Sequence, residues 1–295
     1  MAFRSFLLFI LALVVFGIGT TAEVGAVTIN YGHFSDLSQF TLNGSTGSIA
    51  NPTFYNGQDV LRLTDNLGQG GSAFLTNSVA LEDGGGFQAS FSTFFSFQIS
   101  NPQGASDVDG QGADGIVFVV QTNASNVGGG GGGIGYNGIN NSVGVEFDTW
   151  NNGYGDGHNG NHVGIDLNGS MTSVARYNVA PRMNDGDIWY SWVDYNGDTD
   201  LLEVRFSDTF SRPDTAILSH SVDLTAVLGS PDAYIGFTSG TGAAGGYHDI
   251  RSWIFESTYN PINQNPVPEP ATMLLLGSGL IGLAGIRRGK FSKAS

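Results

Sequence analysis

The chain has 295 residues and no cysteine, and 26 acidic side chains outnumber 11 basic ones, which gives a formal charge of −15. This charge argues against nucleic acid as a partner, because phosphate binding needs a basic surface, and the lack of cysteine excludes disulfides and thiolate metal sites. Only 13% of the residues are charged and 45 are glycine, and no long stretch has helical periodicity. These features predict one all-β domain of sandwich size.

The N-terminal segment has the layout of a secretory signal. A basic residue precedes an apolar run of 13 residues from Phe6 to Ile18, and small residues follow. This run is short for a membrane span, which needs about 20 residues. We therefore expect residues 1–26 to be a signal peptide, cleaved after Ala22 or after Ala26, rather than a retained anchor.

Residues 27–258 contain repeated strand patterns. In FQASFSTFFSFQI, residues 87–99, apolar side chains occupy the odd positions, while glutamine and serine occupy most even ones, which predicts a strand with one buried and one solvated face. Residues 188–195 and 201–208 flank the turn sequence NGDTD and predict a hairpin. Many such strands without helices predict two packed antiparallel sheets of the jelly-roll kind.

One strand carries two acids on the same face. In VGVEFDTWNNGYGDGHNGNHVGIDLNG, residues 143–169, Glu146 and Asp148 are two positions apart and therefore point the same way, within about 7 Å of each other. Like charges at this distance destabilise each other unless a cation or a proton lies between them. The alternative without a functional role is a pair of hydrated surface acids.

The glycine-rich loop after this strand supplies Asn152, Asp156 and His162. Carboxylates, an amide oxygen and a backbone carbonyl form a set of hard oxygen ligands that suits Ca²⁺. An added imidazole suits Mn²⁺ or another transition ion beside it. The segment therefore predicts a cation site.

This loop resembles the metal loop of the legume-type (L-type) lectins, in which such residues bind a Ca²⁺ and a transition metal. The resemblance makes Asp148 and Asp156 bridging carboxylates and assigns Glu146 and His162 to the transition metal, expected to be Mn²⁺. The implied ligand set is Glu146, Asp148, the Trp150 carbonyl, Asn152, Asp156 and His162.

Asp156 comes one residue earlier than is usual in plant members of the family, which leaves His158 and Asn159 as alternatives for its role. The spacing of sixteen residues between Glu146 and His162 agrees with the family pattern.

Three further segments match this family in chain order. GADGIVFVVQ resembles its ADG strand, in which the Asp, here Asp114, follows a cis peptide and hydrogen-bonds sugar hydroxyls. VGGGGGGIGY resembles the glycine loop whose backbone N–H touches the sugar, here Gly132, with either neighbouring glycine as a register alternative. TSGTGAAGGYHDIRSWIFES resembles the final loop and strand, which implies that the N–H groups of Ala243 and Ala244 face the ligand.

The resemblance implies a concanavalin A-like fold for residues 27–258 and calcium-dependent binding of glycans or polysaccharides. Asp114 would accept hydrogen bonds from two hydroxyls, Asn152 would donate an amide hydrogen, and Trp150 would offer a ring face to the sugar. The cations would order Asn152 and Asp114 without touching the ligand. The sugar recognised and a homo-oligomeric state stay open at this point.

Two other functions fit parts of the sequence. Related sandwiches host glycosidases with the strand pattern E-x-D-x-x-E, but Asn151 stands where the second Glu is needed, so we expect no catalysis. The third class is a structural or adhesive matrix protein that kept the fold without sugar binding. The joint presence of Asp114, Asn152 and Trp150 argues against that loss.

The remaining acids and tryptophans receive structural assignments. Asp107 and Asp109 lie in DVDGQGAD, which lacks the closing Glu of an EF-hand loop, so we expect solvated loop acids. Trp189, Trp192 and Trp253 lie on strand patterns and are expected in the core.

The C-terminal segment carries VPEP (residues 267–270), an apolar run and a basic cluster. This order resembles the PEP-CTERM sorting signal of Gram-negative bacteria, whose tail is removed by a membrane enzyme of the exosortase type. We expect residues 259–266 to be a linker and residues 267–295 to hold a short transmembrane helix, from Ala271 to Ile286, with its basic tail in the cytoplasm. The mature protein would then reach the cell surface or the extracellular space. The alternative is a permanent anchor.

Overall fold

The computed structural model describes residues 26–81, 88–153 and 155–263. Apart from residue 26, the expected signal peptide lies outside these ranges, as do residues 264–266 of the expected linker and the whole expected sorting segment. Within the described ranges, no helix is long and apolar enough to cross a membrane.

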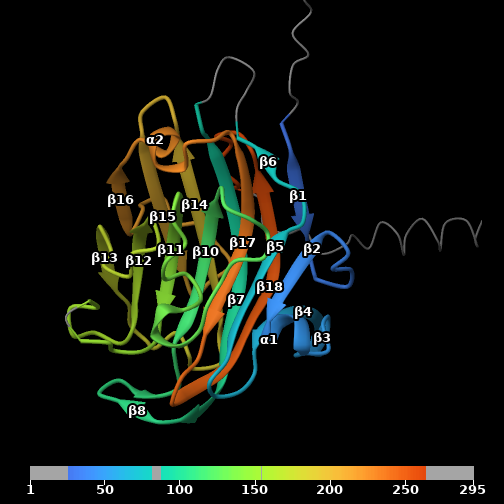
Figure 1. The fold of residues 1–295 in the computed structure, drawn as a ribbon. Helices are drawn as coiled ribbons and strands as arrows, with labels where there is room; N and C mark the ends of the chain where they lie inside the picture. Colours follow the sequence, from blue (N-terminus) through green and yellow to red (C-terminus); the bar gives the residue numbers. More distant parts are fainter. Residues whose placement is uncertain (1–25, 82–87, 154, 264–295) are drawn as a thin grey trace, which may run out of the picture.

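Two antiparallel sheets form the body of the protein (Figure 1). The front sheet has the order β13–β12–β11–β10–β17–β5–β2, and β6 pairs with β17. Its strands are β2 (Phe40–Gly44), β5 (Gly70–Leu75), β6 (Val79–Ala80), β10 (Gly115–Gln121), β11 (Ser142–Asp148), β12 (His162–Leu167), β13 (Ala175–Asn178) and β17 (Asp232–Gly240).

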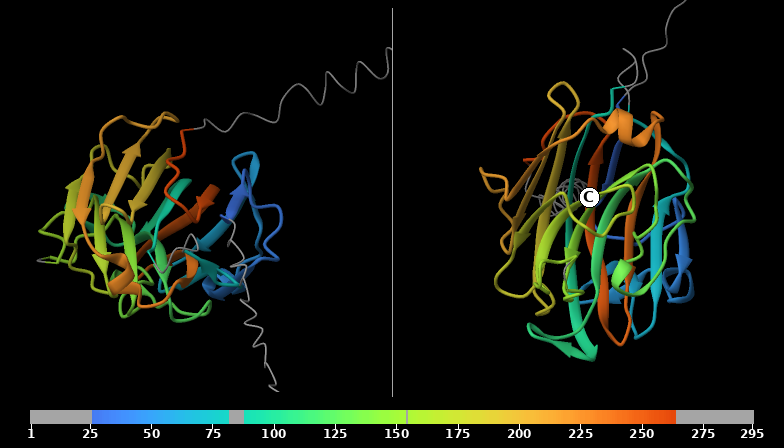
Figure 2. Two further views of the ribbon diagram at one scale, coloured as in Figure 1. Left: turned by 90° about the horizontal axis from the view of Figure 1, so that it is seen from above. Right: turned by 60° about the vertical axis from the view of Figure 1, so that its left-hand side comes forward.

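The back sheet has the order β16–β15–β14–β7–β18–β4–β3, and β1 pairs with β18. Its strands are β1 (Thr28–Tyr31), β3 (Thr53–Tyr55), β4 (Gln58–Thr64), β7 (Phe91–Gly104), β14 (Ile188–Asn196), β15 (Leu201–Ser207), β16 (Leu218–Ser221) and β18 (Ala244–Glu256). Figure 2 shows the two sheets as stacked layers. The expected all-β, two-sheet sandwich is therefore confirmed, and so is the expected hairpin, because β14 pairs with β15.

Few other elements connect the strands of the described chain. A small hairpin of β8 (Ser106–Asp107) and β9 (Gly110–Gln111) lies at one end of the sandwich (Figure 1). The helical turns are α1 (Ser45–Ser48), α2 (Leu224–Leu228) and the 3₁₀ turn η1 (Gly131–Gly133). Asp223 caps α2 by accepting a hydrogen bond from the Ala226 N–H at 2.9 Å, and Gly229 ends it in the left-handed conformation.

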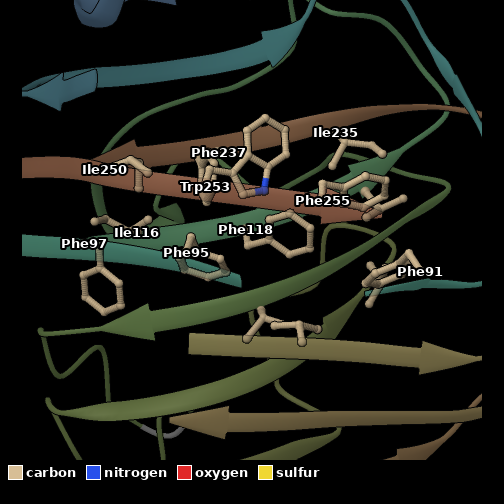
Figure 3. Close-up of a cluster of buried hydrophobic side chains, with 14 of the residues drawn as sticks. Phe91, Phe95, Phe97, Ile116, Phe118, Ile235, Phe237, Ile250, Trp253 and Phe255 are labelled. Atoms are coloured by element: carbon tan, nitrogen blue, oxygen red, sulfur yellow. The ribbon is translucent and has the colours of Figure 1, made fainter. Parts of the chain in front are cut away.

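Aromatic side chains fill the space between the sheets (Figure 3). Phe95 of β7 lies 5.2 Å from Phe237 and 5.6 Å from Phe147, ring centre to ring centre, and both partners belong to the front sheet. Trp253 and Phe97 are buried in the same cluster, as the alternation along the chain predicts. Each buried ring contributes about 1.5–3 kcal/mol through burial of apolar surface.

The outer face of β7 differs from the sequence-based expectation. We expected solvent there, but Ser92, Phe94, Ser96 and Gln98 are all buried. Phe94 packs on Trp192, with ring centres 5.1 Å apart, and two later segments of the chain cover both rings. The expectation failed because these covering segments are distant in sequence, and because β7 also lies inside the sheet between β14 and β18.

Those two covering segments supply Phe210 and Ile262. The Asn260 N–H also donates to Ser92 Oγ at 3.0 Å. The first residues of the expected linker therefore pack on the back sheet.

We predict that Phe95→Ala lowers the free energy of unfolding by about 3–5 kcal/mol, because it removes a ring that joins the two sheets and leaves a cavity. Phe54→Ala is the matched control, since 73% of the Phe54 side chain is exposed and its loss should change stability by less than about 0.5 kcal/mol. Urea denaturation measures both, and equal effects would contradict this packing.

Candidate functional site

The site is assembled by three neighbouring strands of the front sheet. Asp148, the last residue of β11, pairs with His162, the first residue of β12, and with Gly115 of β10 on the other side. Glu146 points to the same side of β11 as Asp148 because it lies two positions earlier. Strand register alone therefore gathers two acids and a histidine at one end of the sheet.

Glu146, Asp148 and His162 are all buried, and one ligand atom from each lies within 4.8 Å of the other two. His162 Nε2 is 3.2 Å from Glu146 Oε1, and Ser173 Oγ donates a hydrogen bond to the same oxygen at 2.6 Å. This grouping of two carboxylates and an imidazole agrees with the predicted cation site.

The loop of residues 150–161, which we call the metal loop, folds back over these strands. Asp148 Oδ1 accepts a hydrogen bond from the Trp150 N–H at 2.6 Å. Asp156 is 5% exposed and accepts a hydrogen bond from the Asn152 N–H. The two loop residues that sequence analysis assigned to the metals thus contact each other.

Asp114 lies beside this group, directly before β10. The Ala113–Asp114 peptide is cis, as expected. The Thr149 N–H donates to Asp114 O at 2.8 Å, and the Asp114 N–H donates to Gly240 O at 3.0 Å. Its carboxylate is buried, yet Oδ2 has no hydrogen-bond partner in the described structure. Such an atom is rare in native proteins and indicates a missing donor.

Burial and neighbouring charges raise the pKa values of three of these acids, Asp148, Asp114 and Asp156. Burial, followed by the charges of Glu146 and Asp156, raises the pKa of Asp148 well above its usual range. Burial, followed by Asp156, raises the pKa of Asp114 to about 7. The pKa of Asp156 is also raised, chiefly by burial.

Little cationic charge balances these acids: within the described chain, His162 and Arg176 lower the pKa of Asp156, and His162 Nε2 lies 3.2 Å from Glu146 Oε1. The described residues place no lysine or arginine within ion-pair distance of Glu146, Asp148 or Asp114. The donor set and its uncompensated charge therefore fit a bound cation.

Sequence analysis missed Asp166. It lies on β12 with His162 and Gly164 on one face and is fully buried beside Glu146 and Ser173. Burial, followed by the charge of Glu146, raises the pKa of Asp166 well above its usual range. The alternation in HVGID could have revealed it, because every second residue of a strand shares a face.

Among the segments assigned to sugar contact, the final loop approaches Asp114: a Cβ at Gly242 would lie 3.9 Å from Asp114 Oδ2. Asn152 is exposed and Trp150 is half-buried. A side chain at Gly132 would come within 2.7 Å of Asn152 Oδ1, so glycine lets this loop lie directly against Asn152. Ala243 is exposed at the rim, whereas Ala244 is buried and begins β18 opposite Gly104.

Packing holds the glycine loop in this place. Ile134 and Tyr136, which follow the glycines, are buried on the outer face of the front sheet in a second apolar cluster with Phe74, Val117 and Val119. Thr238 Oγ1 donates to Ile134 O at 2.8 Å. The loop is therefore anchored from the sheet and positions Gly132.

One expectation about other acids has a clear outcome. Asp107 and Asp109 were expected to be solvated, which is wrong: both are partly buried, and each accepts a backbone hydrogen bond from the metal loop. Glu203 lies on β15 of the back sheet opposite Asp194, and Glu256 lies on β18 opposite Thr28. Neither glutamate belongs to the sheet that carries Glu146.

Comparison with known proteins gives two family matches. The family model of the legume lectin domain matches residues 26–270, and that of the PEP-CTERM protein-sorting motif matches residues 266–288.

Curated relatives include plant receptors and lectins. The probable L-type lectin-domain containing receptor kinase S.7 of Arabidopsis thaliana is 31% identical over 250 residues, which cover 76% of this chain and 35% of the kinase. The seed lectin of Styphnolobium japonicum is 34% identical over 181 residues, 58% of either protein. The chain spans between 24% and 35% of the length of the receptor kinases that it matches first.

Solved structures show the same fold. The basic winged bean lectin with Tn-antigen superposes with a TM-score of 0.63 at 25% identity, over 79% of this chain and 98% of the lectin. The lectin from Bauhinia forficata in complex with GalNAc superposes with a TM-score of 0.62 at 25% identity, over 80% of this chain and 100% of that lectin. Peanut lectin superposes with a TM-score of 0.62 at 27% identity, over 79% of this chain and 97% of the peanut lectin. The jelly-roll sandwich is thereby confirmed.

We predict that the chelator-treated protein loses stability as the pH rises from about 4 to about 7. A carboxyl whose folded pKa is raised keeps its proton in the folded state after the unfolded chain has released it, so raising the pH favours unfolding. Each such group contributes up to about 1.4 kcal/mol per pH unit. Thermal unfolding across this range measures the slope.

The control for this slope is Asp114→Asn, which removes a carboxyl whose pKa is raised to about 7 and should flatten the pH dependence. A stability that is constant or rises over this range in the metal-free protein would contradict the described burial of the acids.

Proposed function

The chain belongs to the legume lectin domain family, and from this premise we propose that it is an exported lectin that binds carbohydrate in a calcium-ordered pocket. The observation that carries the proposal is the buried, unpartnered Oδ2 of Asp114. A buried carboxylate oxygen without a donor is unfavourable by itself, and a sugar hydroxyl would supply the missing hydrogen bond. Asn152 is exposed and Trp150 is half-buried, so both are accessible to a ligand.

Each of these groups has a definite role in the proposed pocket. Asp114 accepts hydrogen bonds from two hydroxyls, and Asn152 donates from its amide. The ring of Trp150 offers an apolar face to the pyranose, as sugar sites commonly do. Backbone N–H groups at Gly132, Ala243 and Ala244 complete the set at the rim.

The residues present also fit the two cations that legume lectins generally bind. We assign Glu146 and His162 to a transition metal such as Mn²⁺, and Asp148 and Asp156 to a bridging position. Asn152 and the carbonyl of Trp150 complete the calcium site. When bound, the cations supply positive charge that offsets the buried acids, and the chain's own residues then hold Asn152 and Asp114 in position for the sugar.

The arrangement of the chain ends suits display of this pocket. Strand β18 runs for 13 residues from Ala244, beside the pocket, to Glu256, a length of about 40 Å at roughly 3.3 Å per residue. The Ser257 N–H donates to Val27 O at 3.0 Å. Val27 and Ser257 therefore lie together at the pole opposite the pocket.

We propose the following route to the cell surface. Residues 1–26 direct export, and residues 27–258 form the lectin domain. After the linker of residues 259–266, the sorting segment of residues 267–295 anchors the chain briefly until an exosortase-type enzyme removes it. The match of the PEP-CTERM motif to residues 266–288 supports this route. Cell surface or extracellular space is the proposed destination.

No catalytic step is included in the proposal. A glycosidase of this fold needs a second carboxyl close to Glu146. Asn151 stands at the position of that carboxyl in the strand pattern, and Glu203 and Glu256 lie on the back sheet. A structural or adhesive protein without sugar binding is the remaining alternative, and the binding experiments below separate it from the lectin.

We predict that Asp114→Ala weakens glycan binding by about 100-fold or more, because two hydrogen bonds to a charged group are lost, while the sandwich stays folded. The matched control is Asp208→Ala, an exposed acid in the loop after β15, which should bind like the wild type. A glycan array that includes N-acetylgalactosamine reads out binding, and circular dichroism reads out folding. Unchanged binding by Asp114→Ala would show that the pocket is assigned wrongly.

We further predict that chelation abolishes glycan binding and that Ca²⁺ with Mn²⁺ restores it. Without cations, the charges of Asp148 and Asp156 repel each other. Asn152 then has no bound calcium to fix its side chain. Array binding before chelation, after it and after reloading measures the effect. Full binding in excess chelator would contradict a cation-ordered pocket, and hydrolysis of a polysaccharide would favour the enzyme.

A further inference from the structure

The small β8–β9 hairpin contacts both ends of the metal loop through two carboxylates. Asp107 Oδ2 accepts a hydrogen bond from the Asn151 N–H at 2.9 Å. Asp109 Oδ2 accepts one from the Gly160 N–H, also at 2.9 Å. These contacts join segments 44 and 51 residues apart in the chain, so they are tertiary contacts and not turn geometry.

Gly160 is suited to this contact because it has no side chain. A Cβ at this position would collide with Asp107 Oδ2 and come within 3.0 Å of Asp109 Oδ2. Both carboxylates can therefore approach the loop backbone only because residue 160 is glycine. This close approach indicates that the hairpin and the loop form one packed unit.

The hairpin is itself fixed by a local network. Asp107 uses its other oxygen, Oδ1, to accept hydrogen bonds from the N–H groups of Asp109 and Gly110 at 2.9 and 3.0 Å. The Asn184 side chain donates to Gln111 O at 3.2 Å. Asp107 Oδ2, which accepts from the metal loop, therefore belongs to a hairpin that is fixed by its own hydrogen bonds.

Arg182 connects the hairpin to the start of the metal loop. Its two terminal nitrogens donate to Gln111 O at 3.4 Å and to Thr149 O at 3.2 Å. Thr149 directly precedes the loop. Arg182 thus makes a third link between the hairpin and the loop, near the end that contains Asn151.

Between the two anchors lie Asn152 and Asp156, the loop residues assigned to the cations. This segment also contains Gly153, Gly155 and Gly157, and glycine gives the free chain many conformations that binding would have to restrict. Holding the ends of a short loop removes part of that freedom before a ligand arrives. Anchoring the metal loop at both ends should therefore raise its affinity for a cation.

We propose that Asp107 and Asp109 are positioning residues of the metal site: they hold the metal loop at Asn151 and Gly160, so that Asn152 and Asp156 face Asp148 before a cation binds. This role rests on the proposed function, since it concerns the same site. The two carboxylates act through the loop backbone, and their Oδ2 atoms are occupied by N–H groups.

The test is calcium titration of the chelator-treated protein by isothermal titration calorimetry. Asp107→Ala and Asp109→Ala should each weaken Ca²⁺ affinity by about tenfold, because each variant loses one hydrogen bond between a charged acceptor and the metal loop; Asp107→Ala also loses the two bonds that Oδ1 accepts within the hairpin. Asp208→Ala, which removes an exposed acid outside the hairpin, should bind Ca²⁺ like the wild type. Thermal unfolding confirms that each variant is folded.

A second variant separates positioning from the mere loss of negative charge. Asp109→Asn loses the same charge as Asp109→Ala but keeps an oxygen that can accept from the Gly160 N–H. We expect Asn at this position to restore most of the affinity. If Asp109→Asn binds Ca²⁺ as weakly as Asp109→Ala, charge alone explains the effect and the positioning role is overturned.

Hydrogen exchange of the chelator-treated protein gives an independent readout that requires no metal. Exchange at the amides of Asn151 and Gly160 should accelerate in the matching alanine variants, because each amide loses its acceptor. Unchanged exchange and unchanged affinity would overturn the inference while leaving the lectin proposal intact. A wild-type protein that binds no Ca²⁺ would overturn the proposed function, and the exchange rates would then decide alone whether the hairpin holds the loop.

Discussion

Mutual repulsion among buried carboxylates at one end of the sandwich is the constraint on which the site depends. Glu146, Asp148 and Asp156 are each 5% exposed or less; burial and then the charges of Glu146 and Asp156 raise the pKa of Asp148, and burial is the main cause that raises the pKa of Asp156. No arginine or lysine of the described chain forms an ion pair with Glu146 or Asp148. A fold that brings these acids together is most stable when protons or cations neutralise them.

The rest of the sandwich makes that arrangement rigid. Phe147 lies between the two strand acids in sequence and points the other way, into the aromatic core, where its ring lies 4.8 Å from that of Phe97. The same strand therefore presents charge on one face and apolar surface on the other. Because the core fixes β11, the acids cannot move apart to relieve their repulsion, and the site keeps its affinity for positive charge.

Sequence alone predicted the parts of the structure that repeat along a strand. Alternation placed Phe95 and Phe97 in the core, and the two-residue spacing of Glu146 and Asp148 placed them on one face. It failed for β7's outer face, because burial there depends on Phe210 and Ile262 from distant segments. It also missed the contacts of Asp107 and Asp109 with the metal loop, since a side chain that binds a remote backbone N–H leaves no local pattern. The assignment of Asp114 came from family resemblance and not from spacing.

The central claim is that cations, held by this acidic cluster, give the sugar pocket its shape. Elemental analysis of the exported protein, purified without chelator, tests it most directly. The account predicts about one calcium and about one transition-metal ion per chain, both lost together when Asp148 is replaced by alanine. A folded protein that binds glycans yet contains neither metal would contradict it.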